Sequence, residues 1–153
     1  MDYHTLSKIT VFTVIGLLLA GASIATRADA TTDPEPLALR RIMQDLGRNM
    51  QSAADGISRE DWVLTEVTAQ LISGHPEPPI AEKVRILSFI GSDAGKFRGY
   101  DRKVVDAARL MAQASREMDG EAVINAFHAL QTSCFDCHRT FREPFLEHFY
   151  GRE

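Results

Sequence analysis

Apolar residues recur at intervals of three and four along most of the chain, which is the spacing of one face of an amphipathic helix. The first stripe starts at Leu39 and predicts a helix over residues 37–54, ended near Gly56. A second stripe predicts a helix over residues 59–73, which Gly74 and the proline-rich run after it stop. The first half of the chain therefore predicts two helices joined by a short link.

The second half predicts two more helices. One covers residues 101–118 and ends at the turn-forming pair Asp119 and Gly120. The last helix has the longest stripe in the chain, formed by Val123, Phe127, Leu130, Cys134, Cys137, His138 and Phe141. No stretch alternates with period two for long enough to predict a strand. Because short links join the first helix to the second and the third to the fourth, we expect an all-α, up-down-up-down four-helix bundle.

Three places in the pattern are less regular. Residues 76–99 predict a long connection with one short helix, since the run GSDAGKFRG holds three glycines and favours a loop. His75 precedes a proline and is expected at the surface of this loop. Pro144 has no backbone N–H, so we expect it to kink or end the last helix.

The charge balance narrows the function classes. The 153 residues carry 17 lysines and arginines against 21 acids, which gives a formal net charge of −4. No broad basic surface is available to neutralise phosphates, so we expect no nucleic-acid partner. The hydrophobic share of 44% is enough for one modest core.

The first thirty residues differ from the rest. Lys8 precedes an uncharged run over residues 9–25, and the small residues of ADA at 28–30 match what a signal peptidase recognises. We therefore expect residues 1–30 to be a cleaved signal peptide and residues 31–153 to form one mature domain in the periplasm, without a membrane span. The alternative is an uncleaved anchor, because the uncharged run approaches the length that spans a bilayer.

Both cysteines of the chain lie in the run CFDCHRTFR on the last predicted helix. Cys134 and Cys137 are about 4.5 Å apart along the helix axis, and His138 follows Cys134 by four residues. All three are expected to face the bundle interior. Two thiols at this spacing can add to the vinyl groups of one haem while the adjacent imidazole binds the iron. The pattern therefore predicts one haem c held by two thioethers, with His138 as the proximal ligand.

Other uses of the two cysteines fit the sequence less well. A thioredoxin-type redox pair is expected beside a strand, and the chain predicts none. A zinc site needs four ligands, and adjacent cysteine and histidine ligands on one ion are geometrically awkward. A disulfide between residues three apart would strain the helix that carries them.

The chain resembles the cytochrome c′ family, the class II c-type cytochromes. The resemblance rests on a single C-x-x-C-H on the last helix of a four-helix bundle, continuing as CHRTFR, and on LRRIMQDLGRNM in the first helix. The first-helix run is similar to the low-spin branch and implies that Met43 is the sixth iron ligand. From the residues alone, a methionine on such a stripe is more often core filling than an iron ligand. Gly47, one turn later, would let a flat ring approach, and Met50 is the rival ligand, two turns further along.

The resemblance implies a single-electron carrier with iron held by His138 and Met43, which exchanges electrons with redox partner proteins and needs no catalytic residues. Dimers are common in the family, so a homodimer is possible, but no helix face is apolar enough all round to require one. The alternative is a binding protein for nitric oxide or carbon monoxide, with an open or displaceable distal position. A peroxide-consuming enzyme would need a distal base, and the stripe beside Met43 offers neither a histidine nor an acid.

Overall fold

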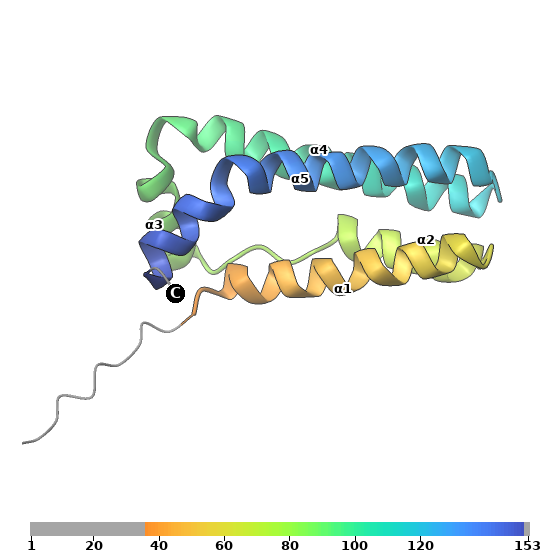
Figure 1. The fold of residues 1–153 in the computed structure, drawn as a ribbon, viewed down its shortest axis with the longest axis horizontal. Helices are drawn as coiled ribbons and strands as arrows, with labels where there is room; N and C mark the ends of the chain where they lie inside the picture. Colours follow the sequence, from red (N-terminus) through yellow and green to blue (C-terminus); the bar gives the residue numbers. More distant parts are fainter. Residues whose placement is uncertain (1–35, 152–153) are drawn as a thin grey trace, which may run out of the picture. The chain divides into compact units, whose positions relative to one another are not determined.

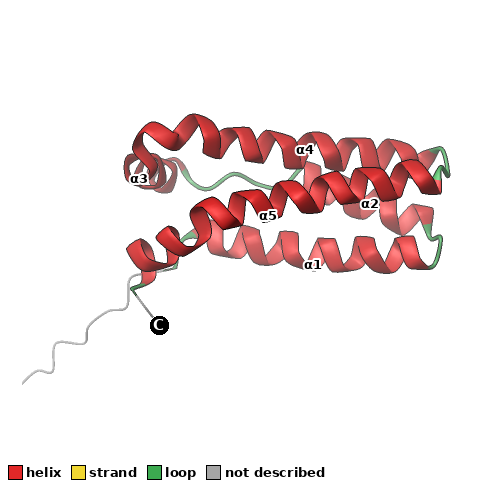
Figure 2. Cartoon of the chain, turned by 45° about the horizontal axis from the view of Figure 1, so that its top comes forward, coloured by secondary structure: helices red, strands yellow, loops and turns green. Residues whose placement is uncertain are grey.

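The computed structural model describes residues 36–151, and all of its regular elements are helices (Figures 1 and 2). In chain order they are α1 (Ala38–Ser58), α2 (Trp62–Ser73), α3 (Ile80–Ile90), the short 3-10 helix η1 (Gly91–Asp93), α4 (Ala94–Arg116) and α5 (Gly120–Tyr150). Within this part of the chain no helix is long and apolar enough to cross a membrane. The expected signal peptide at residues 1–30 lies outside the described residues, so its cleavage stays a prediction.

The four long helices pack as the expected up-down-up-down bundle. α1 runs beside α2, α2 packs on α4, and α4 packs along α5 (Figure 1). The fourth side of the bundle is different, because α1 touches α5 only briefly. The short helix α3 lies at the end of the bundle where α4 begins and α5 ends.

The link between α1 and α2 corrects the role predicted for Gly56. Instead of ending the first helix, Gly56 is buried inside α1, which continues to Ser58. A Cβ at this position would lie 2.6 Å from the hydroxyl oxygen of Thr65 on α2. The glycine therefore allows a close approach of two helices. α2 begins at Trp62, and the carboxylate of Asp61 accepts a hydrogen bond of 3.0 Å from the backbone N–H of Leu64.

The run GSDAGKFRG is not the expected loop, apart from the turn at Gly91, whose φ is +58°. The run forms η1, which begins at Gly91, and the first turns of α4, with Gly95 and Gly99 inside the helix. Each internal glycine costs a helix about 1 kcal/mol relative to alanine. Aromatic packing opposes this cost, because the rings of Phe97 and Tyr100 lie 5.3 and 6.3 Å from the ring of Phe141 on α5.

Pro144 also behaves differently from an end signal. α5 continues through it for six residues, and Figure 1 shows these last turns bending toward α3. The helix persists because Phe145 and Phe149, beyond the proline, pack on Phe89 of α3. The ring centre of Phe89 lies 5.5 Å from that of Phe145 and 5.4 Å from that of Phe149. Burial of these rings offsets the backbone hydrogen bond that proline cannot make.

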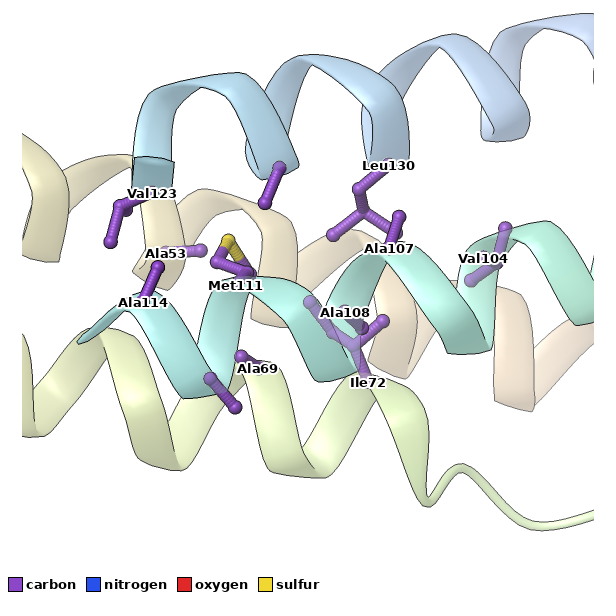
Figure 3. Close-up of a cluster of buried hydrophobic side chains, with 12 residues drawn as sticks. Ala53, Ala69, Ile72, Val104, Ala107, Ala108, Met111, Ala114, Val123 and Leu130 are labelled. Atoms are coloured by element: carbon purple, nitrogen blue, oxygen red, sulfur yellow. The ribbon is translucent and has the colours of Figure 1, made fainter. Parts of the chain in front are cut away.

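Two hydrophobic clusters divide the interior. The main cluster takes residues from all four long helices, many of them alanines, and Figure 3 shows their side chains pointing toward one another. Its buried members are Ala53, Ala69, Ile72, Val104, Ala107, Ala108, Met111, Ala112, Ala114, Val123, Ala126 and Leu130. The second cluster is built around Leu37, Ile86 and Phe149 and joins the start of α1, α3 and the end of α5.

The start of α1 is fixed by residues far away in the sequence. Leu37 occupies the N-cap position and has no side chain that could accept a hydrogen bond. Instead, the carboxylate of Glu82 on α3 accepts from the N–H groups of Ala38 at 2.7 Å and Leu39 at 2.8 Å. The Tyr150 hydroxyl at the end of α5 accepts from the N–H of Leu37 at 3.1 Å. A negative group at a helix N-terminus is favoured by the helix dipole as well.

Candidate functional site

The two cysteines lie on the inward side of α5. Both are half-buried and neither forms a disulfide, and Cys134 packs against the main cluster. His138 is more exposed and lies at the edge of this side. The expectation that all three residues face the bundle interior therefore holds for the two cysteines but not for His138, which is exposed.

The surroundings of the two thiols disfavour thiolate chemistry. Burial raises the pKa of Cys134, and burial together with the charges of Cys134 and Asp101 raises the pKa of Cys137 to about 11. Reactive redox cysteines instead have thiolates stabilised by positive charge or a helix N-terminus. The raised pKa values of both thiols argue against a thioredoxin-type pair.

The surroundings of His138 favour the neutral form of its imidazole. Partial burial lowers its pKa, and the positive charge of Arg142 one turn later lowers it further. A neutral imidazole keeps a lone pair on one ring nitrogen, which a metal ligand requires.

Phe135, between the two cysteines, faces outward and is exposed, with the guanidinium of Arg139 5.6 Å from its ring centre.

The opposite side of the site is the stripe of α1, which protein atoms only partly cover. Ile42 and Ala53 are buried, but Met43 on the same stripe is 38% exposed. A Cβ added to Gly47 would meet no atom within 4 Å, so there is open space one turn beyond Met43. Met50, the rival ligand, packs against the main cluster.

These residues fit a c-type haem. Two free thiols and a neutral imidazole lie on α5, a thioether sulfur lies on α1, and these two helices hardly touch each other. An apolar ring between them would cover the part of the α1 stripe that the protein leaves open. Zinc fits less well, because residues 36–151 contain no group of three or more histidines, cysteines or acids able to hold a metal ion.

His75 was expected at a loop surface, and this expectation is wrong. Its side chain is only 12% exposed, and its Nε2 lies 3.2 Å from the carboxylate of Asp101 on α4. Hydrogen bonding to Asp101 raises the pKa of His75, and burial opposes this effect. His75 also lines a cavity of about 300 Å³ with Ile42 and Leu46 of α1.

Sequence reasoning missed both His75 with Asp101 and the cap formed by Glu82. No local signal announces either, because the partners are 26 and more than 40 residues apart. Asp101 also lies near Cys137, because its charge contributes to the raised pKa of that thiol. The contact of His75 with Asp101 joins the connection after α2 to α4, and the cap formed by Glu82 joins the start of α1 to α3.

Comparison with known proteins agrees with this geometry. The family model described as Cytochrome C' matches residues 38–142, from the first residue of α1 to four residues beyond His138. No curated protein and no solved structure gives a significant match. Since the matched region covers more than half of the chain and includes both sides of the site, the chain belongs to the cytochrome c′ family of haem proteins.

Proposed function

We propose that this protein is a periplasmic single-electron carrier in which Cys134 and Cys137 hold one haem c and the iron is bound by His138 and Met43. Family membership supports the coarser part of this proposal, since the family implies a covalent c-type haem and its members are typically periplasmic and generally non-catalytic. The electron-carrier role and the Met43 ligand go beyond it.

The observation that supports the Met43 ligand is its place on α1. Met43 is the methionine on the part of the stripe that other helices leave uncovered, and Gly47 leaves open space beside it. Met50 is engaged with the main cluster instead. The soft sulfur of a methionine raises the potential of a haem iron that is also bound by histidine.

The chain's own residues account for the remaining requirements of a carrier. A c-type haem, when bound, supplies an iron that changes its oxidation state by one electron. The two cysteines fix its edge to α5, and His138 offers a neutral imidazole on the same side. The buried ring of Phe141 one turn beyond Cys137, covered in turn by Phe97, keeps water from this part of the interior.

Absorption spectra of both oxidation states, with and without carbon monoxide, test the proposal. We expect a low-spin spectrum that carbon monoxide does not change. Met43→Ala is expected to become high-spin and to bind carbon monoxide, with the haem still attached, whereas the matched control Met50→Ala keeps the low-spin spectrum. An unchanged spectrum in Met43→Ala would refute this ligand. A high-spin native protein that binds carbon monoxide would favour the second candidate, a gas-binding protein.

A further inference from the structure

A short segment at the start of α4 concentrates positive charge. Residues 96–103, KFRGYDRK, contain four bases and one acid, and all four bases are exposed. Within the described part of the chain, no carboxylate lies at ion-pair distance from Lys96, Arg98 or Arg102. The single acid, Asp101, is paired with His75. We call Lys96, Arg98, Arg102 and Lys103 the basic segment of α4.

The basic segment lies beside the attachment residues. Phe97 and Tyr100, which alternate with its bases, pack on Phe141 one turn after Cys137. Asp101 is close enough to Cys137 for its charge to raise the thiol pKa. The surface positive charge and the thiols are therefore on neighbouring helices at the same level of the bundle.

The rest of the bundle has the opposite balance. The bundle can be divided into two parts by residue range. The part away from the cysteines, residues 44–74 and 104–133, contains nine acids and four lysines or arginines. The part around the cysteines, residues 36–43, 75–103 and 134–151, contains seven acids and ten lysines or arginines. The described bundle is thus positive around the attachment residues and negative at its other end. The two propionates of a haem would reduce the positive excess without reversing it. The net charge of −4 is therefore not spread evenly over the chain.

We propose that the basic segment of α4 is the docking surface for a redox partner protein with an acidic surface. This inference rests on the proposed electron-carrier function. Complementary charge steers two proteins into encounter and selects the orientation in which they meet. A partner drawn to this segment would meet the end of the bundle that holds the haem, which electron exchange requires.

Two small oxidants of opposite charge test the local field on the haem-loaded protein. Ferricyanide is a trianion and tris(phenanthroline)cobalt(III) is a trication, and each takes one electron from the reduced protein. We expect the rate with ferricyanide to fall as salt is added and the rate with the cobalt complex to rise. The net charge of the whole chain predicts the reverse.

Variants on a single helix locate the effect. Arg98→Gln with Arg102→Gln is expected to slow ferricyanide about fivefold at low ionic strength. Arg109→Gln with Arg116→Gln is the matched control, because it makes the same charge change further along α4 and is expected to slow ferricyanide less than about twofold. Unchanged haem spectra and melting temperatures show that both variants fold.

Three results would overturn the inference. The first is a salt dependence that follows the net charge, and the second is an equal effect of both variant pairs. The third is salt-sensitive binding to phosphatidylglycerol vesicles that Arg98→Gln with Arg102→Gln abolishes, since this assigns the segment to a membrane surface. Failure to exchange electrons with either oxidant would instead refute the carrier function itself.

Discussion

The two ends of the bundle fill their interiors in different ways. Around Met111 and Leu130, side chains from four helices meet at the centre, and small residues such as Ala53 and Ala69 let the helices approach closely (Figure 3). At the level of Met43, the apolar stripes of α1 and α5 continue, but the two helices hardly touch and Met43 stays partly exposed. Beyond this level the second cluster, around Leu37, Ile86 and Phe149, closes the end of the bundle.

An apolar stripe on a helix does not specify what covers it. The stripe of α1 is regular from Leu39 to Ala53, yet other helices bury only part of it. One end of the bundle is a protein core, and the other is a partly open apolar surface next to two thiols and an imidazole. The second arrangement is what a bound flat ring requires, since apolar surface is stable only when something apolar covers it.

The largest effect is expected where the thiols are removed. Cys134→Ala with Cys137→Ala should abolish covalent attachment, so that acidified organic solvent extracts all of the haem. The native protein should keep its haem in the same extraction, and each single variant should retain one thioether bond. Retention of haem by the double variant would show that attachment does not use these sulfurs.

A truncation in the closed core should lower stability strongly. Leu130 is fully buried, so Leu130→Ala is expected to lower the free energy of unfolding by about 3 kcal/mol, measured with urea on the haem-loaded protein. Leu110→Ala is the control, because Leu110 on α4 is exposed and its truncation should cost less than about 0.5 kcal/mol. Equal costs would mean that Leu130 does not pack in a closed core as described.

The cap of α1 should have a smaller effect that reaches the open end. Glu82→Ala leaves two backbone N–H groups of α1 without their acceptor and is expected to cost about 1 kcal/mol, with faster hydrogen exchange at Leu39. Glu77→Ala is the control, since Glu77 is exposed and pairs only with Lys83. Equal exchange rates at Leu39 in the two variants would argue against the cap.

The smallest effect is a pH dependence from His75. Its pKa is raised in the folded protein, so its pair with Asp101 stabilises the fold below the ordinary histidine pKa of about 6.5 and loses this contribution as pH rises through the folded value. His75→Gln should therefore be less stable than the native protein at low pH by up to about 1 kcal/mol, with the gap narrowing at alkaline pH. Glu77 and the other histidines are present in both proteins, so their contributions largely cancel in the difference. A stability difference between the two proteins that is the same at low and at alkaline pH would contradict the prediction.

Local chemistry explains which sequence expectations are confirmed. The four long helices and the short helix at Ile80–Ile90 were predicted because periodic apolar residues report a helix wherever they occur. Gly56 and the start of α4 were misjudged for a common reason, whereas Pro144 kinks α5 without ending it, which is one of the two outcomes expected. Glycine and proline weaken a helix locally by a known amount, but contacts from another helix can outweigh or even require them.

Helical periodicity and the spacing of Cys134, Cys137 and His138 can be read from the chain alone, since both depend on residues within one or two turns of each other. Three other features depend on how the helices pack: α1 and α5 stay apart, Glu82 fixes the start of α1, and His75 meets Asp101. These contacts join residues far apart in the chain, and their free energies depend on how whole helices pack, which no local pattern records.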